Sequence, residues 1–394
     1  MKRTAFISDG LHRKSLAAVR ALGKHGVEVL VASDEFFAPS FWSRYTRKKF
    51  PLNLIAGEIN SNEVFFSQFS DSKPVFFPME DATIQWLSSN REYLSNYFEF
   101  LIPCKDSLIV SFSKYKTSVI ARKLGLSVPD FLLFESPVEL RKTINANVNL
   151  YLNEKYLLKP EIGHGSAGII YLDEFTENEW NNFDLEKHFK FHGNVLLQRR
   201  LPSEGKSIGV SLLFDSSNKL IANFVHQRIS SYPISGGPST NRISIEDNYL
   251  LEQSVKLLEE LKWQGVAMVE WKIDSATGLP YLLEINPRFW GSLELAIRSG
   301  VNFPVLYYDL VCGNQVVPIK SYLLGKIVRW VFPGDILRFF SSSRSERESL
   351  PKFIRLLFKN SEEWDRRDIS GSMAAIFAPL FMLFKRKYWK LLNR

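Results

Sequence analysis

The sequence predicts a protein of mixed class, α/β at its N-terminus and α+β further on, followed by a mainly helical C-terminal extension. In the first 107 residues, short apolar runs at Thr4–Ser8, Val27–Ala32 and Val75–Phe77 alternate with segments such as Leu16–Lys24, which has helical spacing. Buried strands that alternate with helices indicate a parallel sheet. Between residues 156 and 288, strands come in pairs around short turns, which is typical of antiparallel sheets.

The turns between the paired strands define three expected hairpins. These are Tyr156–Lys159 with Ile169–Leu172, Ile208–Phe214 with Leu220–Arg228, and Val266–Asp274 with Tyr281–Asn286. Helical patterns cover Lys114–Leu124, which ends at Gly125, and the amphipathic segment Glu246–Leu261. The first strand-to-helix turn of the chain lacks the GxGxxG pattern, so we expect no dinucleotide site there.

Composition excludes several classes of protein. The chain has 394 residues, of which 45% are hydrophobic and 23% charged, a globular composition long enough for two or three domains. Its two cysteines, Cys104 and Cys312, lie far apart without a CxxC pattern, which argues against a disulfide scaffold or a cysteine zinc site. No apolar run reaches the roughly 20 residues of a membrane span, and the first residues lack the apolar core of a signal peptide. We therefore expect a cytoplasmic protein.

The net charge of +8 is unevenly distributed along the chain. Residues 319–394 hold 16 Lys and Arg against 7 Asp and Glu, whereas the other residues hold 34 against 35. The extension ends with the apolar run Ala374–Phe384 and the basic, aromatic segment Lys385–Lys390. Two interpretations stay open: a helical appendage packed on the body, or a segment that contacts a membrane from the cytoplasmic side. In the absence of a recognisable motif, we expect no nucleic-acid partner.

The loop at residues 159–168 has the composition of a phosphate-binding flap. It contains three glycines and a serine, and Lys159 stands where the chain leaves the preceding strand. Small residues let backbone N–H groups approach a phosphate closely, and the lysine adds a positive charge. No helix follows the loop, so it is not a Walker A motif. A glycine-rich turn without a ligand is the alternative.

A second cluster of polar residues lies on the last expected hairpin. Its register pairs Glu270 with Glu284, and strand alternation places Asn286 on the same face as Glu284. Directly opposed carboxylates repel each other unless a cation lies between them, and oxygen ligands beside phosphates suit Mg²⁺. Arg228 and Arg288 are placed to bind an anion at this site, although structural salt bridges would explain them too.

In this order and at this spacing, the motifs resemble those of the ATP-grasp superfamily, and most of all its carbamoyl-phosphate-synthase-like group of predicted carboxylate–amine ligases. The resemblance covers about residues 1–318 and is carried by Leu158–Gly168, His226–Ile229 with Gly236–Thr240, and Leu283–Ser292. It implies a pre-ATP-grasp domain at 1–107 and a two-lobed ATP-grasp domain at 108–318. The smaller lobe with the flap would span 108–195 and the larger lobe 196–318, leaving 319–394 as the basic, aromatic extension.

The resemblance also implies a role for each motif residue. The residues implied to bind ATP are Lys114, Lys159, Gly163, Gly165, Ser166, Gln198, Arg200, Leu201 and Glu204. Lys116 is a rival of Lys114, and Lys206 a rival of Glu204 at the ribose. Two positions depart from the family pattern: Ser113 replaces an Asp, and Arg199 replaces an acidic residue of the adenine-binding linker.

The implied ligands of Mg²⁺, or of Mn²⁺ in its place, are Glu270, Glu284 and Asn286, and the implied catalytic residues are Arg228 and Arg288. In such enzymes a carboxylate attacks the γ-phosphate of ATP to give an acylphosphate, and an amine then displaces phosphate. A carboxylase-like or kinase-like reaction, or a nucleotide-binding module without catalysis, is the alternative. His164 and His226 are interpreted as polar loop histidines, and a role in proton transfer is the alternative. The carboxylate and the amine, whether small molecules or glycan or peptide precursors, and the oligomeric state stay unidentified.

Overall fold

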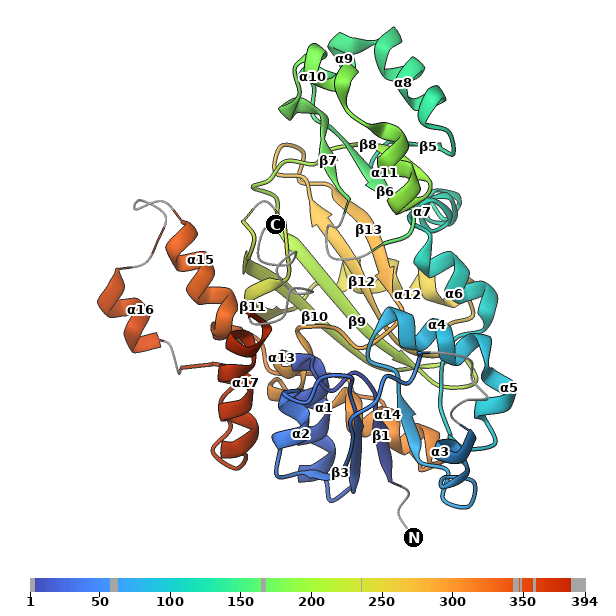
Figure 1. Cartoon of the computed structure of the whole chain (residues 1–394), viewed down its shortest axis with the longest axis vertical. Coiled ribbons are helices and arrows are strands. Elements are labelled where there is room, and N and C mark those ends of the chain that lie inside the picture. Colours follow the sequence, from blue (N-terminus) through green and yellow to red (C-terminus); the bar gives the residue numbers. More distant parts are fainter. Residues whose placement is uncertain are drawn as a thin grey trace.

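The computed structural model describes residues 4–56, 63–163, 168–234, 236–342, 347, 349–356 and 359–383 of the chain. Three sheets form its framework. Figure 1 shows the N-terminal sheet at the lower end, the largest sheet in the middle and a smaller lobe at the upper end. This arrangement confirms the predicted combination of a parallel N-terminal sheet with antiparallel sheets. The helical C-terminal extension lies along one side of the body.

The N-terminal sheet has four parallel strands in the order β3-β2-β1-β4. They are β1 (Ala5–Ile7), β2 (Val29–Ala32), β3 (Thr46–Phe50) and β4 (Val75–Phe77). Because successive side chains of a strand point to opposite faces, Ala5 and Ile7 enter one core with residues of α1 (Arg13–Lys24), whereas Phe6 enters a second, aromatic core. The other helices of this region are α2 (Pro39–Trp42), α3 (Glu63–Ser67), α4 (Asp81–Ser89), α5 (Arg91–Leu94) and α6 (Lys105–Phe112).

The smaller lobe begins with α7 (Lys114–Lys123), whose first turn is capped by Ser113. The Ser113 hydroxyl oxygen accepts a hydrogen bond of 3.0 Å from the backbone N–H of Lys116. The sheet of the lobe has the order β5-β8-β6-β7, with β5 (Phe131–Phe134), β6 (Tyr156–Pro160), β7 (Ile170–Tyr171) and β8 (Val195–Arg199). Its helices are α8 (Pro137–Ala146), α9 (Val148–Asn153), α10 (Glu177–Asn182) and α11 (Leu185–His192). They enclose a core around the fully buried Trp180.

The larger lobe is built on a six-stranded antiparallel sheet in the order β13-β12-β9-β10-β11-β14. Its strands are β9 (Ser207–Phe214), β10 (Leu220–Ser231), β11 (Ser239–Ile245), β12 (Gly265–Ile273), β13 (Pro280–Asn286) and β14 (Ile327–Arg329). The two predicted hairpins of this lobe are therefore confirmed, with ends shifted by a few residues. Its helices are α12 (Asn248–Glu260), α13 (Leu293–Arg298) and α14 (Phe303–Val311). The sheet is buried on both faces, because Leu213 packs towards the N-terminal core and Leu212 towards α12.

The C-terminal extension consists of a short turn at Val331–Asp335 and the helices α15 (Ile336–Ser341), α16 (Leu350–Leu356) and α17 (Ile369–Leu383). The large sheet itself continues past residue 318, because β14 pairs with β11 through Arg242 and Val328. The segment before α17 packs on the body, where Arg20 of α1 forms a buried ion pair of 2.8 Å with Asp368. In the described part of the chain, no helix has both the length and the apolar character that a membrane crossing requires.

Candidate active site

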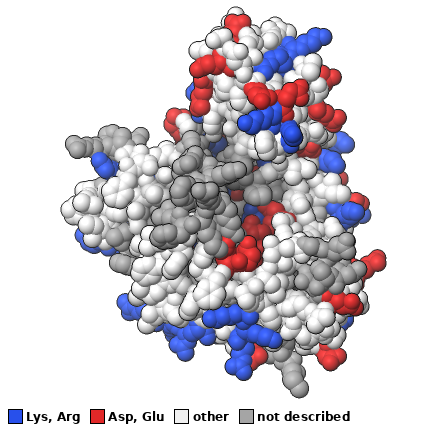
Figure 2. All heavy atoms as spheres, in the orientation of Figure 1, with Lys and Arg blue, Asp and Glu red and all other residues white. Residues whose placement is uncertain are grey.

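The candidate site lies where the two lobes and the N-terminal domain meet. Strands β12 and β13 form its floor, the start of α7 and the end of β6 border it from the smaller lobe, and the loops after β1 and β4 reach it from below. Figure 2 shows acidic side chains gathered in a hollow near the middle of this face.

The predicted pairing of two carboxylates across the last hairpin is confirmed. Glu270 of β12 lies directly opposite Glu284 of β13 in the antiparallel register. Asn286 joins them, since its Nδ2 donates to Glu270 Oε1 (3.2 Å) and to Glu284 Oε1 (3.3 Å). Burial raises the pKa of Glu270, Arg228 opposes this effect and Glu284 adds to it. Glu270 is thus a buried carboxylate under repulsion from a neighbouring one.

Two lysines approach the same carboxylates from the smaller lobe. Lys114 Nζ lies 4.0 Å from Glu284 Oε2 and donates to the backbone oxygen of Gly163 (2.5 Å). Lys159, at the end of β6, is 8% exposed. Burial and the nearby Lys114 lower the pKa of Lys159 to about 7, and Glu284 opposes this shift. Such a lysine is poised to gain a proton when an anion enters the site.

These side chains fit a divalent cation that is shared with phosphate groups. The described residues contain no group of three or more His, Cys, Asp or Glu side chains able to hold a metal ion by themselves. Glu270 and Glu284 supply two carboxylates, and an amide turned so that Asn286 Oδ1 faces inward would supply a third oxygen. Mg²⁺ is commonly held by one or two carboxylates together with substrate phosphates, so this smaller set suits it.

Both predicted anion-binding arginines lie at the edge of the site, each held by an acid. Arg228 Nη2 is 2.5 Å from Glu270 Oε2, and Arg288 Nε is 2.8 Å from Asp81 Oδ1. Arg288 also donates to the backbone oxygen of Phe289 (3.2 Å). These ion pairs fix the orientation of the two guanidinium groups and leave donors on each for a further anion.

The predicted adenine linker begins within β8, at Gln198, and continues past the end of that strand. Gln198 is 4% exposed and Leu201 is 8% exposed. The side chain of Arg200 turns outward, because Nη1 contacts both carboxylate oxygens of Asp173 (2.9 and 3.0 Å) and the guanidinium lies 4.0 Å from the ring centre of Tyr171. The N–H of Arg200 donates to the backbone oxygen of Lys155 (2.7 Å). The side chain and the N–H of Arg200 are thus both engaged within the smaller lobe.

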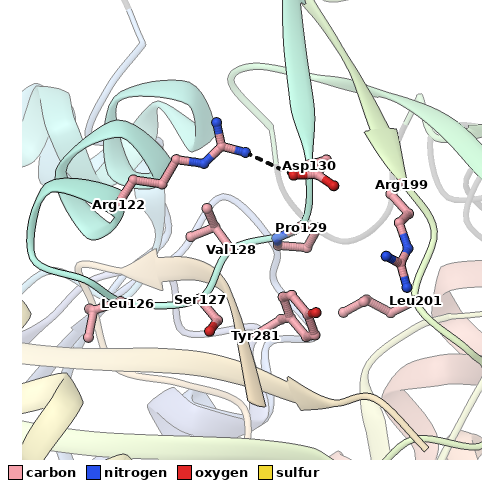
Figure 3. Close-up of a pocket in the computed structure, with 9 residues that line it drawn as sticks. All are labelled: Arg122, Leu126, Ser127, Val128, Pro129, Asp130, Arg199, Leu201 and Tyr281. Atoms are coloured by element: carbon pink, nitrogen blue, oxygen red, sulfur yellow. Dashed lines mark hydrogen bonds and ion pairs between the residues drawn. The ribbon is translucent and has the colours of Figure 1, made fainter. Parts of the chain in front are cut away.

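A cavity of about 380 Å³ lies beside this linker (Figure 3). It is lined by Arg122, Leu126, Ser127, Val128, Pro129, Asp130, Arg199, Leu201 and Tyr281. Arg122 and Asp130 form an ion pair of 3.3 Å at its rim. Of the described residues predicted to bind ATP, only Leu201 lines this cavity, and its lining includes none of the converging lysines and carboxylates.

Glu204 lies on an exposed turn between β8 and β9. Its Oε1 accepts a hydrogen bond of 2.9 Å from Ser203 Oγ. That hydroxyl and the backbone N–H of Glu204 lower the pKa of the carboxyl, its own N–H having the larger effect. Lys206 is exposed on the same turn, and Lys272 of β12 reaches it through the backbone oxygen of Ser203 (3.5 Å). Both candidates for the ribose contact therefore lie on this one exposed turn.

Several polar residues at the site have no counterpart in the sequence-based prediction. Lys14, 5% exposed at the start of α1, contacts Glu80 at 2.7 Å and donates to the backbone oxygen of Phe289 (3.2 Å). Burial and Arg288 lower the pKa of Lys14 to about 8. Burial raises the pKa of Glu80, but Lys14, His12 and Arg288 together bring it down to about 2. The sequence does contain a signal for these residues. They follow β1 and β4, and the carboxyl ends of parallel strands commonly carry binding groups.

The interpretation of His226 as a loop histidine is wrong. His226 lies within β10, is 1% exposed, and its Nε2 is 3.0 Å from Ser292 Oγ. Burial, with Arg228 and Arg242, lowers its pKa to about 3, so it is neutral at physiological pH. Within the predicted flap, Gly163 is described with a φ of 157°, whereas His164, Gly165 and Ser166 lie outside the described residues.

Comparison with known proteins accounts for this architecture. The crystal structure of N5-carboxyaminoimidazole synthetase from Staphylococcus aureus matches with a TM-score of 0.65 at 15% identity, covering 88% of this chain and 87% of that protein. A family described as "ATP-grasp in the biosynthetic pathway with Ter operon" matches residues 193–331. The chain has an ATP-grasp fold. The fold that the motifs implied by their resemblance is thereby confirmed.

Two further structures share the ATP-grasp architecture of this chain. The biotin carboxylase domain of 2-oxoglutarate carboxylase from Hydrogenobacter thermophilus, in complex with MgADP, matches with a TM-score of 0.63 at 14% identity, covering 82% of this chain and 74% of that one. L-amino acid ligase from Bacillus licheniformis matches with a TM-score of 0.57 at 18% identity, covering 82% and 76%. No curated protein matches the chain in sequence.

Proposed function

We propose that the chain is an ATP-dependent ligase that joins a carboxylate to an amine and releases ADP and phosphate. The observation that carries the proposal is the convergence of Glu270 and Glu284, opposed across β12 and β13, with Lys114 and the buried Lys159. This set suits ATP with Mg²⁺, and Mn²⁺ would fit the same oxygen ligands. The structures with this fold include an amino acid ligase and enzymes named for carboxylation chemistry.

In the first half of the reaction, an oxygen of the substrate carboxylate attacks the γ-phosphorus of ATP. The bond from the γ-phosphorus to the bridging oxygen breaks, and ADP leaves with that oxygen. Lys114 and Lys159 would neutralise charge on the phosphates, because both approach from the smaller lobe. Mg²⁺ held by Glu270, Glu284 and Asn286 would shield the charge of the phosphate oxygens.

In the second half, the amine nitrogen attacks the carbonyl carbon of the acylphosphate, the bond from that carbon to the phosphate oxygen breaks, and the nitrogen loses a proton. Arg228 and Arg288 would hold the anionic intermediate, because ion pairs with Glu270 and Asp81 fix their positions at the edge of the site. The substrates would be small molecules or precursors of glycans or peptides. The proposed location is the cytoplasm.

The proposal is tested by following ADP release over a panel of paired carboxylates and amines with Mg·ATP. A ligase releases ADP with a carboxylate and an amine together, and mass spectrometry then detects the amide. Release that needs only one substrate would instead indicate carboxylase-like or kinase-like phosphoryl transfer. ATP binding without turnover over the whole panel would indicate a nucleotide-binding module.

The metal assignment has its own test in Glu284→Gln, which keeps the shape of the side chain and removes its charge. We expect turnover to fall at least 100-fold, because a ligand that binds Mg²⁺ and opposes Glu270 loses its charge. Glu259→Gln, at an exposed position on α12, is the matched control and should retain full turnover. Full Mg·ATP turnover by Glu284→Ala would rule out the proposed metal site.

A further inference from the structure

Helix α17 packs on the body through small residues and exposes large apolar ones. Its buried side consists of small residues, including Gly371, Ser372 and Ala378. Large apolar side chains repeat at three- and four-residue spacing on the opposite side, and all of them are 41–60% exposed: Ile369, Met373, Phe377, Leu380 and Phe381. The water-facing side of a surface helix is normally polar. The pattern of α17 is therefore the reverse of the one that packing on the body alone would produce.

The exposed side of α17 continues onto the neighbouring surface of the N-terminal domain. Figure 1 shows α17 beside α2, and the ring of Phe381 stacks on that of Phe37 at 5.9 Å. Next to Phe37, Phe36 is 73% exposed, and its ring centre is 6.0 Å from that of Trp42, which is 43% exposed. We call Phe36, Trp42 and the five exposed residues of α17 the α17 face. Contiguous apolar surfaces of this kind mark interaction sites.

Basic residues border the α17 face at one end and along one flank. Arg366 and Arg367 are exposed just before the helix, and Arg44 donates to the backbone oxygen of Arg367 (3.3 Å). Lys49 lies 4.9 Å from the ring centre of Trp42. Figure 2 shows Lys and Arg side chains gathered at the lower end of the molecule, where Figure 1 places α2 and β3.

The sequence that follows α17 is also rich in basic residues. It contains Lys385, Arg386, Lys387, Lys390 and Arg394, which lie outside the described residues. Two exposed acids are close in sequence to the basic flank. Glu28 lies 3.9 Å from Arg47, and Asp34 precedes Phe36 by two residues. Positive charge therefore predominates around the apolar surface.

We propose that the α17 face docks on the surface of a membrane that contains anionic phospholipids, with the helix lying in the plane of the interface. Apolar and aromatic side chains with an adjoining basic border are the combination that interfacial helices use. A second copy of the chain is the other occupant to consider. Two copies would bring two basic borders together, and like charges oppose association, whereas an anionic lipid surface attracts both. An anionic membrane would therefore both bury the apolar side chains and attract the basic residues around them.

The inference is tested by vesicle flotation of the full-length protein. Vesicles of phosphatidylcholine with an equal part of phosphatidylglycerol should carry the protein upward at low salt, and less of it at high salt. Vesicles of phosphatidylcholine alone should carry much less. Equal flotation with both kinds of vesicle, or none with either, would overturn the proposal.

Substitutions within the full chain separate the apolar from the basic contribution. Phe377→Ser with Phe381→Ser should lower binding about 100-fold, at about tenfold for each half-exposed aromatic side chain. Lys385→Glu with Lys387→Glu should lower binding to the anionic vesicles at least 25-fold. Phe191→Ser is the matched control. Phe191 is also exposed (71%), but it lies on α11 of the smaller lobe and not in the α17 face, so its replacement should leave vesicle binding unchanged.

Light scattering and ATP turnover complete the test. If the pair of Phe substitutions leaves flotation unchanged, the α17 face is not the lipid-binding surface. If the wild-type protein forms a dimer that these substitutions dissociate and shows no flotation, the face is an interface between two copies and the membrane proposal is wrong. ADP release should be the same for the variant with both Phe substitutions and for the wild type. The membrane proposal is therefore tested independently of the proposed reaction.

Discussion

The low pKa of Lys159 predicts that ATP binding takes up a proton. Lys159 is 8% exposed, and burial together with Lys114 lowers its pKa to about 7, against 10.5 for a free lysine. Above pH 7 the ammonium form is the minor species in the empty site. A bound triphosphate places negative charge beside Lys159, which favours the ammonium form and raises its pKa again. Binding at pH 8 or 9 must therefore draw a proton from solution.

The size of the effect follows from the shift. At pH 9, two units above the pKa of about 7, only about one chain in a hundred carries the charged lysine. The apparent affinity for ATP should therefore fall about tenfold for each pH unit above 7, which corresponds to about 1.4 kcal/mol per unit. Below pH 7 the affinity should level off, since the lysine is already charged.

Calorimetry measures both quantities. Titrations of ATP with excess Mg²⁺, in buffers of different ionisation enthalpy at pH 8.5, should report uptake of nearly one proton. Lys159→Met should bind ATP at least tenfold more weakly at pH 6.5 and should lose the uptake, whereas Lys142→Met, at an exposed position of the same lobe, should behave as the wild type. An affinity that is constant from pH 6.5 to 9, without proton uptake, would refute the reasoning.

Three further predictions concern stability and can be checked by urea unfolding. Asp368→Asn should lower the free energy of unfolding by about 3–5 kcal/mol, because it removes one partner of the buried ion pair with Arg20; retention of wild-type stability would contradict this. Gly265→Ala should cost more than about 2 kcal/mol, because Gly265 has a φ of 76° and a Cβ there would lie 2.3 Å from a backbone oxygen; a neutral substitution would show that this contact relaxes. The depressed pKa of Glu80 stabilises the folded protein fully above about pH 4.5, and this stabilisation is lost as the pH falls towards 2. The difference in free energy of unfolding between the wild type and Glu80→Gln should therefore shrink across that range. A difference that stays constant would contradict the assignment.

Local regularities explain why much of the fold and of the site is predictable from the sequence. Side chains alternate along a strand and a short turn fixes the register, so the pairing of Glu270 with Glu284 follows from their positions around one turn. The helix that starts at Lys114 is similarly marked by its N-cap, Ser113. Neither inference needs information about residues far away in the chain.

Contacts between distant segments carry no such local signal. Arg288 pairs with Asp81, and Arg20 pairs with Asp368, although each pair is more than 200 residues apart in the sequence. Periodicity reports that a side chain is buried and does not identify its partner. The pairing of β14 with β11 is missed for the same reason, since a three-residue strand has almost no pattern of its own.

The same limitation affects the charge of the C-terminal extension. Counted along the sequence, the extension is a basic segment attached to a nearly neutral body. In the structure, three of its described acidic residues pair with basic residues of the body: Glu362 with Arg13 and Arg242, Asp365 with Lys24, and Asp368 with Arg20. Basic residues of the body therefore neutralise these three acids, whereas the neighbouring Arg366 and Arg367 are exposed. The two interpretations of the extension are thus compatible, because Asp365 and Asp368 hold it on the body while large apolar side chains of α17 stay exposed.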